Sequence, residues 1–486
     1  MRYLALCTDY DGTLATDGRV LPETLSALER LLASGRRLVL VTGRELDQLK
    51  EVCPRLDLFE YVVAENGALL YQPSTGEETP LATPPPASFV STLKERGVGR
   101  ISVGRVIVAT WEPHEITVLA TIRDLGLELQ VIFNKGAVMI LPAGVTKASG
   151  LAHALSRMEI SPHNAVAVGD AENDHALLAS CECGVAVANA LPTLKSAADL
   201  VTAADHGAGV VELIDKLLTD DLASLEPRLT RHHVLLGTDD GGAEIRIAPH
   251  GETVLVVGPS GSGKAELATG LMERLAAQGY TFCVIDVAGR YERFGKAVTL
   301  GGPSRPPTAS EIVKLFQGAD QSGIVNLIGL QPGDRLPFLK DLAPQLTNLR
   351  LRLGRPHWTM IDDIGALLPP GDAATGALPL GAGDSVLHMT ARPTMVAREV
   401  LRSTSLFIAV GESNHVLLEE FCQVSGVNPP ATRLAPSSDA TALAWRPKIT
   451  AATPFRLNIA PPQREPSRVN APLTSAVERR STAHKM

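Results

Sequence analysis

Short apolar runs that end at polar turns alternate with helical patterns in the first part of the chain. Residues 3–8 form an apolar run that ends at Asp9, and residues 37–41 form another that ends at Thr42. Between them, apolar positions recur at helical spacing over residues 21–32. Strand, helix and strand in this order predict a parallel sheet.

A proline-rich stretch over residues 72–88 predicts a linker, and a small mixed unit follows it. The expected elements of this unit are strands over 105–110, 129–133 and 137–141 and a helix over 115–125. The alternation then returns with a helix over 147–158 and a strand over 165–168. We therefore expect one α/β domain over residues 1–221, with an inserted unit at about 75–145.

A second α/β pattern occupies residues 222–445. Its expected strands are 253–257, 282–285 and 359–361. Residues 446–486 are dominated by Pro, Arg, Ser and Thr, which predicts a disordered tail. The expected fold class is thus α/β in both domains.

The overall composition narrows the function classes. The net charge of -8 over 486 residues gives no support to a nucleic-acid or anionic-membrane partner. Six cysteines without paired CxxC spacing favour a reducing compartment. No uncharged run approaches the ~20 residues of a membrane span. We therefore expect a cytoplasmic protein.

Two carboxylates follow the first strand directly, in the run Asp-Tyr-Asp-Gly-Thr-Leu that starts at Asp9. Side chains at positions i and i+2 on a chain that leaves a strand can aim at one point. Asp9 can then attack phosphorus while Asp11 handles protons. Taken alone, this run could also be a surface turn.

Three further elements accompany it in order. Thr42 and Gly43 end the second strand and offer a hydroxyl and backbone N–H groups to a phosphate. Lys147 begins a helix and can offset the charge of phosphate and aspartates together. The acidic loop over 169–174 suits Mg²⁺, which prefers oxygen ligands.

These residues resemble the haloacid dehalogenase (HAD) superfamily, in its Cof-like branch with a subclass IIB cap between the second and third motifs. DYDGTL, VTGR, Lys147 and GDAEND match the four motifs, and the ENGA run at 65–68 resembles a loop common in that branch. The resemblance covers about residues 1–218. It implies a Rossmann-like core with a small α+β cap.

The resemblance also implies a Mg²⁺-dependent phosphatase that forms an aspartyl-phosphate. Its substrate would be a small phosphorylated metabolite, such as a sugar phosphate or phosphoglycolate. The implied roles are Asp9 as nucleophile, Asp11 as acid and base, Thr42, Gly43, Lys147 and Asn173 around the phosphoryl group, and Asp9, the Asp11 carbonyl, Asp170 and Asp174 as metal ligands.

A glycine-rich turn, Gly258–Lys264, fits the phosphate-binding pattern GxxxxGK between an expected strand and helix. Its backbone N–H groups would cradle phosphate, and Lys264 would reach it. The next residue is Ala265, where a hydroxyl on Mg²⁺ is usual. A glycine-rich turn without nucleotide is the alternative.

The runs VIDVAGRY at 284–291 and GRPHWTMIDD at 354–363 resemble P-loop ATPases of the HerA/FtsK class, over about residues 231–425. The implied nucleotide site contains Gly258, Gly261, Ser262, Gly263, Lys264, Ala265, Asp362 and Asp363. Asp362 matches the Mg²⁺ ligand, whereas Asp363 stands where the family has a glutamate that polarises water. We expect this domain to bind ATP and to hydrolyse it slowly. Formation of an oligomer through this domain is left as an open question.

Two functions from different classes remain. The first is a phosphatase with a fused nucleotide-binding domain, favoured because its motifs are intact. The second is an ATP-binding regulatory or motor module with an accessory phosphatase. A scaffold without activity would require four intact motifs to be relics. His388 and the pair His232 and His233 are expected to be structural, because nothing at metal-ligand spacing accompanies them.

Overall fold

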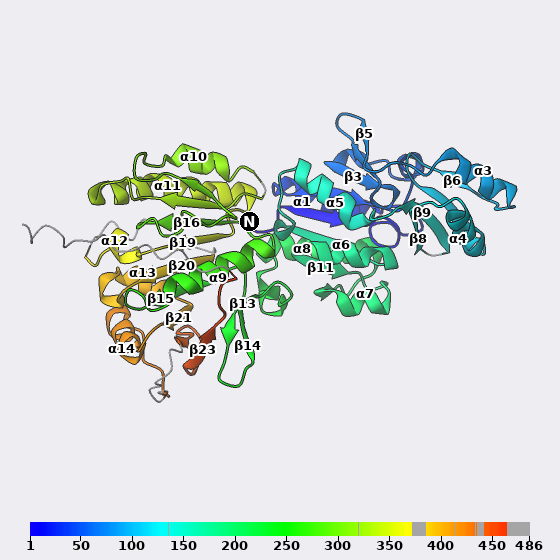
Figure 1. Ribbon diagram of the computed structural model, residues 1–486. Coiled ribbons are helices and arrows are strands. Elements are labelled where there is room, and N and C mark those ends of the chain that lie inside the picture. Colours follow the sequence, from blue (N-terminus) through cyan, green and yellow to red (C-terminus); the bar gives the residue numbers. More distant parts are fainter. Residues whose placement is uncertain are drawn as a thin grey trace, which may run out of the picture. The chain divides into compact units, whose positions relative to one another are not determined.

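The computed structural model describes residues 1–134, 136–318, 320–371, 385–412, 414–432, 434 and 442–463. The chain divides into two compact units (Figure 1). The first consists of Met1–His233 with Phe316–Asp320 and Leu346–Pro356; the second consists of Val234–Leu315, Gln321–Gln345 and the described residues after Pro356. Part of the expected tail, residues 464–486, lies outside the described residues.

A mostly parallel sheet forms the centre of the first unit, in the order β12-β11-β10-β1-β2-β3-β4-β5. Its strands are β1 (Ala5–Thr8), β2 (Arg37–Val41), β3 (Tyr61–Ala64), β4 (Leu69–Gln72), β5 (Glu77–Pro80), β10 (Ala165–Gly169), β11 (Cys183–Ala186) and β12 (Leu200–Val201). Neighbours from β12 to β3 pair in parallel, and β4 and β5 add antiparallel strands. The central strands are buried along their length, as expected when helices cover both faces of a parallel sheet.

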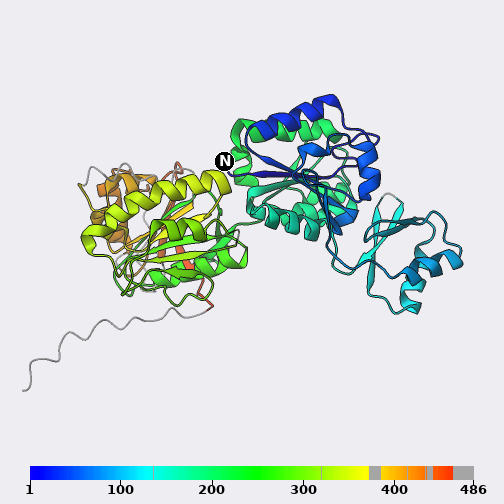
Figure 2. The same ribbon diagram turned by 90° about the horizontal axis from the view of Figure 1, so that it is seen from above.

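Helices lie on both faces of this sheet, and α1 packs against α8 on one of them (Figure 2). The helices of this core are α1 (Pro22–Ala33), α2 (Leu46–Val52), α5 (Lys147–Arg157), α6 (His175–Ser180), α7 (Pro192–Ala197) and α8 (His206–Asp220), with short 3-10 turns η1 (Leu56–Leu58), η2 (Glu65–Gly67), η3 (Pro162–Asn164), η4 (Glu172–Asp174) and η5 (Ala223–Arg228). This arrangement is the Rossmann-like α/β core predicted for the first domain.

An α+β module is inserted between β5 and α5, and we call it the cap module. It contains α3 (Ala87–Glu95), β6 (Ser102–Val103), β7 (Val108–Trp111), α4 (Glu115–Asp124), β8 (Leu129–Asn134) and β9 (Ala137–Pro142), with an antiparallel sheet in the order β6-β7-β9-β8. The expectation of a linker over 72–88 was wrong at Glu77–Pro80. These residues form the edge strand β5, where proline is tolerated because only one side of the strand is paired.

The second unit is built on a sheet in the order β14-β13-β23-β22-β21-β15-β20-β19-β16-β18-β17. Its strands are β13 (Val234–Thr238), β14 (Glu244–Ile247), β15 (Thr253–Val257), β16 (Phe282–Asp286), β17 (Val298–Leu300), β18 (Gly323–Asn326), β19 (Trp358–Ile361), β20 (Ser385–Thr390), β21 (Leu406–Ala409), β22 (Ala442–Trp445) and β23 (Phe455–Ile459). The helical elements after β13 are α9 (Lys264–Ala277), α10 (Ala309–Leu315), α11 (Pro332–Leu353), α12 (Ile364–Leu367), η7 (Pro393–Met395), α13 (Arg398–Ser403) and α14 (Asn414–Ser425).

The assignment of residues 446–486 to a disordered tail was wrong at Phe455–Ile459. These residues form β23, which pairs with β22 and β13 in antiparallel fashion. Leu457 is fully buried there, so the alternation of the strand matters more than the polar composition around it. No helix in the described part of the chain combines the length and the apolar run that crossing a membrane requires.

Candidate active site and a second glycine-rich loop

Two neighbouring parallel strands bring the predicted carboxylates to one edge of the first sheet. Asp9 follows β1 and Asp170 follows β10, and Thr8 lies opposite Val168 in the register. One oxygen from each of Asp9, Asp170 and Asp174 lies within 4.8 Å of the others, and all three residues are buried. The structure thus assembles an acidic trio at the carboxyl edge of the sheet, where α/β proteins bind ligands.

The acidic loop is held by its own hydrogen bonds. The backbone N–H groups of Asp170 and Ala171 each donate to Asp174 Oδ2 at 3.0 Å. A Cβ at Gly169 would lie 2.6 Å from the Asp174 side chain, so this turn requires a glycine. Thr13 Oγ1 donates to Asp170 Oδ1 at 3.0 Å. Both loop carboxylates are therefore fixed before any ligand binds.

Lys147 lies between two members of the trio. Its Nζ donates to Asp9 Oδ1 at 2.5 Å and to Asp174 Oδ1 at 2.6 Å, and its side chain is 1% exposed. The Thr146 side chain caps α5 and fixes where the helix begins. A Cβ at Gly67 would lie only 1.9 Å from the Thr146 carbonyl oxygen. Gly67 therefore allows the helix to start close enough for the ammonium to reach the trio.

The electrostatics of this cluster favour a bound cation. Burial raises the pKa of Asp9 to about 8, with Asp174 adding to the effect and Lys147 opposing it. Burial also lowers the pKa of Lys147, but the carboxylates of Asp174 and Asp9 outweigh it and raise that pKa above its ordinary value. The lysine therefore stays charged. Three buried carboxyl groups surround one ammonium, and their oxygens fit a hard divalent cation such as Mg²⁺.

Asp11 is held by a residue that the predicted site did not include. Arg44 donates Nε to Asp11 Oδ2 and Nη2 to Asp11 Oδ1, both at 2.6 Å. This two-pronged contact is a strong form of ion pair. Thr42 is buried, and its Oγ1 accepts a hydrogen bond from the Arg44 backbone N–H at 3.2 Å. The sequence displayed Arg44 within VTGR, but nothing local indicated that it would pair with Asp11.

The cap module reaches the second motif. A Cβ built on Gly43 would lie 3.6 Å from Met139 Sδ, 3.7 Å from Asn173 Nδ2 and 3.8 Å from Asn134 Nδ2. Asn173 in turn donates Nδ2 to Asn66 Oδ1 at 2.9 Å. Asn134 and Met139 belong to β8 and β9 of the cap module and were missed, because their sequence pattern marks only a hairpin.

Glu65 fastens the cap module to the core. Its carboxylate is fully buried and accepts backbone N–H groups from Arg105 at 2.8 Å, Val106 at 2.7 Å and Ile107 at 2.9 Å. A Cβ at Gly104 would lie 2.6 Å from this carboxylate, so the turn before β7 approaches it closely. The sequence identifies the ENGA run only through a family resemblance. In the structure, its glutamate binds backbone N–H groups of the cap module.

Residues 6–104 and 117–214 match the family described as haloacid dehalogenase-like hydrolase. The phosphoglycolate phosphatase 2 of Saccharolobus solfataricus is 31% identical over 230 residues, which cover 44% of this chain and 93% of that protein. The chain belongs to the haloacid dehalogenase-like hydrolases. The family domain occupies the first unit and is a HAD-type phosphatase, as predicted.

The phosphoglycolate phosphatase of Natronomonas pharaonis is also 31% identical, over 227 residues that cover 43% of this chain and 96% of that protein. Among solved structures, a haloacid dehalogenase-like hydrolase from Bacteroides thetaiotaomicron is 20% identical and covers 44% of this chain and 99% of that one, with a TM-score of 0.40. The two phosphoglycolate phosphatases are thus matched over nearly their whole length.

In the second unit, the predicted glycine-rich turn lies between β15 and α9. Gly261 and Gly263 have φ values of 80° and 104°, which glycine adopts without strain. Lys264 is the first residue of α9 and donates Nζ to the Gly258 carbonyl oxygen at 2.5 Å. Ala265 follows it in the helix. The Lys264 side chain is thus hydrogen-bonded to the backbone of its own loop.

Asp362 follows β19 and faces an arginine. Its Oδ1 lies 3.5 Å from Arg290 Nη1, and burial raises its pKa to about 6 although Arg290 opposes the shift. Burial lowers the pKa of Lys264, and Arg290 adds to that shift. Asp363 has a left-handed backbone with φ 58°. Among the described residues, the buried hydroxyl of Ser262 has no hydrogen-bond partner.

Proposed function

We propose that the HAD phosphatase unit hydrolyses a small phosphate monoester through an aspartyl-phosphate, with Asp9 as the nucleophile and Mg²⁺ as the cation. The observation that supports this most directly is the buried trio of Asp9, Asp170 and Asp174 with Lys147 between two of its members. Phosphoryl transfer depends mainly on positioning and charge neutralisation, and this arrangement can supply both.

In the first step, a carboxylate oxygen of Asp9 attacks phosphorus while the bond to the leaving oxygen breaks, and Asp11 delivers a proton to that oxygen. In the second step, Asp11 takes a proton from water, and the water oxygen attacks phosphorus. The bond to Asp9 breaks, which restores its carboxylate and releases inorganic phosphate. Thr42 and Lys147 hold the phosphoryl oxygens throughout.

The remaining predicted residues complete this proposal. Asn173 and the backbone N–H of Gly43 lie beside the phosphoryl group. Asp9, Asp170, Asp174 and the Asp11 carbonyl would hold Mg²⁺, which would supply positive charge against the phosphoryl oxygens.

Arg44 connects this chemistry to the substrate. A carboxylate held by both prongs of a guanidinium is poorly placed to donate a proton, so the contact between Arg44 and Asp11 must open before the first step. A substrate whose leaving group carries an anion can draw the guanidinium away. Phosphoglycolate has such a carboxylate, and the relatives described above are phosphoglycolate phosphatases. Phosphoglycolate therefore leads the candidate substrates, followed by sugar phosphates.

The test is release of inorganic phosphate by the full chain from phosphoglycolate, sugar phosphates and p-nitrophenyl phosphate, with Mg²⁺ and after its removal by chelation. Asp9→Asn should abolish turnover, because an amide is a poor nucleophile for phosphorus. Asp205→Asn, at an exposed position of the same unit, should leave turnover unchanged. Mg²⁺-dependent turnover near the wild-type rate in Asp9→Asn would refute the proposal.

We propose as a second candidate that residues 222–445 form a HerA/FtsK-like domain that binds ATP and hydrolyses it slowly. The supporting observation is the loop between β15 and α9, where the Lys264 ammonium lies on the carbonyl oxygens of Gly258 and Pro259 at 2.5 and 2.8 Å. A phosphate would have to draw the ammonium off these carbonyls. Ala265 lacks the hydroxyl for Mg²⁺, and Asp363 is one methylene shorter than glutamate, so slow hydrolysis is expected.

Calorimetry with Mg²⁺ and ATP on the full chain tests this second candidate. Lys264→Ala should abolish binding and leave the phosphatase rate unchanged, and Lys296→Ala, which removes an exposed lysine of the same unit, should bind as the wild type does. The double variant Ala265→Ser with Asp363→Glu should raise ATP turnover. ATP turnover faster than phosphate-ester turnover would favour a regulatory or motor module with an accessory phosphatase. Absence of ATP binding to the wild type would exclude both nucleotide functions.

A further inference from the structure

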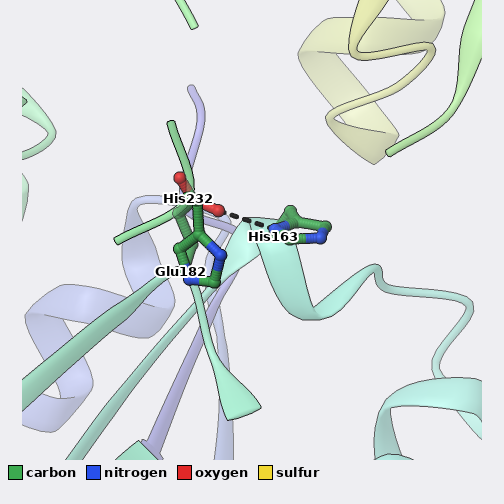
Figure 3. A group of neighbouring side chains, drawn as sticks. All are labelled: His163, Glu182 and His232. Carbon is green, nitrogen blue, oxygen red and sulfur yellow. Dashed lines mark hydrogen bonds and ion pairs between the residues drawn. The ribbon is translucent and has the colours of Figure 1, made fainter. Parts of the chain in front are cut away.

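A second group of metal-binding side chains lies away from the acidic trio. His163 is in η3, which precedes β10; Glu182 directly precedes β11; and His232 lies two residues before β13. These positions are at the amino-terminal ends of the parallel strands β10 and β11, whereas the trio is at their carboxyl edge. One potential ligand atom from each of the three side chains lies within 4.8 Å of the others (Figure 3). Of the three residues, the sequence raises the question of a metal ligand only at His232, because His163 and Glu182 lie far from it along the chain.

The three side chains already face one another. His163 Nδ1 lies 2.6 Å from Glu182 Oε2, and the rings of His163 and His232 are 5.3 Å apart at 89°. In Figure 3 the dashed line joins the Glu182 carboxylate to His163, and the His232 ring lies beside them. Glu182 and His163 are 1% and 7% exposed, and His232 is half-buried. The cluster is thus largely shielded from water.

Backbone contacts hold these segments together independently of the side chains. The Glu182 backbone N–H donates to the Pro162 carbonyl oxygen at 3.0 Å, which ties the strand start to the turn that bears His163. Arg231, next to His232, donates its guanidinium to the Cys181 carbonyl oxygen at 2.7 Å. The three ligands are therefore placed by segments that do not depend on a metal for their position.

Ion pairs position the carboxylate of this cluster. Arg2 holds Glu182 Oε1 at 2.8 Å, which leaves Oε2 directed at the histidines and fixes the carboxylate. Arg231, the residue before His232, is paired with Asp199 Oδ2 at 2.8 Å.

We propose that His163, Glu182 and His232 bind a zinc ion. Two imidazoles and one carboxylate are a donor set that suits Zn²⁺, whereas Mg²⁺ prefers oxygen ligands alone. The zinc ion takes the place of the hydrogen bond between His163 Nδ1 and Glu182 Oε2, the proton of that bond passes to solvent, and water completes the coordination. Because His232 belongs to the segment that follows η5, the ion fastens this segment to the sheet. The site is structural and takes no part in phosphate hydrolysis.

The experiment uses the full chain, stripped with a chelator and returned to saturating Mg²⁺ so that the aspartate trio is occupied. Zinc is then titrated by calorimetry, and thermal unfolding is followed in parallel. At a zinc concentration a hundredfold above the dissociation constant, the midpoint should rise by about 5–10 °C. Co²⁺ in place of zinc should give the visible absorption of a four-coordinate site.

His232→Ala should weaken zinc binding by at least about 100-fold and remove the cobalt absorption, since it deletes a direct ligand. His153→Ala removes an exposed histidine on α5 and should bind as the wild type does. Glu182→Gln provides a second loss of one ligand if His232→Ala fails to fold. The proposal is overturned if the wild type binds no zinc in saturating Mg²⁺, as a simple ion pair of His163 with Glu182 predicts. Unchanged zinc affinity in His232→Ala would overturn it equally.

Discussion

Methionine at position 147 would keep the length of the lysine side chain and remove its charge. In the wild type the ammonium bridges Asp9 and Asp174 at 2.5 and 2.6 Å in a site with 1% exposure. Lys147→Met leaves three buried carboxylates without their cation. Truncating one partner of a buried ion pair typically costs about 3–5 kcal/mol of stability.

The loss should depend on pH. The pKa of Asp9 is about 8 in the folded chain, above the ordinary 3.8. The folded state therefore binds more protons than the unfolded state, and stability falls as pH rises between these two values. Without Lys147 the pKa of Asp9 should rise further, since the cation that opposes the shift is gone, and the fall should continue above pH 8. The variant should be destabilised by about 3 kcal/mol or more near pH 8, and the loss should grow as pH rises further.

Activity should fall as well, by about 10²–10³-fold in kcat, since a positioned charge on the phosphoryl oxygens is lost. The assay is thermal unfolding of the full chain at pH 6.5, 8 and 9.5, beside release of phosphate. Lys94→Met, on the exposed face of α3, is the matched control and should change neither. Equal stability of Lys147→Met and wild type at pH 8, or unchanged kcat, would refute the reasoning.

Three further outcomes follow from the same contacts. Glu65→Gln should lower the free energy of unfolding by about 1.5–3 kcal/mol and slow turnover, because three N–H groups of the cap module lose an ionised acceptor; a thermal midpoint equal to that of the wild type would contradict this. Gly67→Ala should reduce stability and kcat together, since its Cβ would lie 1.9 Å from the Thr146 carbonyl oxygen and displace Lys147; preserved kcat would show that the close approach is unimportant. The Mg²⁺ affinity, measured by calorimetry at pH 6, 7 and 8.5, should rise by up to about tenfold per pH unit below pH 8, because the ion must displace the proton from Asp9; a flat profile would show that Asp9 is ionised without metal.

The local pattern of apolar residues was sufficient to predict the strands that precede the site residues. The apolar runs that became β1, β2 and β10 are buried along nearly their whole length, and such runs specify a strand from neighbouring residues alone. Since parallel strands end at a common edge, Asp9 and Asp170 could be expected to meet there. The same reasoning placed the glycine-rich turn between β15 and α9.

Predictions from local composition were wrong where pairing with another strand determined the structure. Glu77–Pro80 and Phe455–Ile459 lie among prolines and polar residues. The first became a strand by pairing with β4, and the second by pairing with β22 and β13 on its two sides. A short stretch of sequence shows the strand propensity of a segment, but it does not show the strands with which the segment pairs.

The contacts that give the site its particular character depend on packing between remote segments. Arg44 on Asp11 and Glu65 on the turn of the cap module each join residues that no spacing rule connects. His163, Glu182 and His232 meet because two strand starts and the segment after η5 converge. The sequence by itself determined which residue types were present at which strand ends. Which of them touch was decided only by the tertiary fold, because hydrogen bonds and ion pairs act over a few ångströms in space, whatever the separation along the chain.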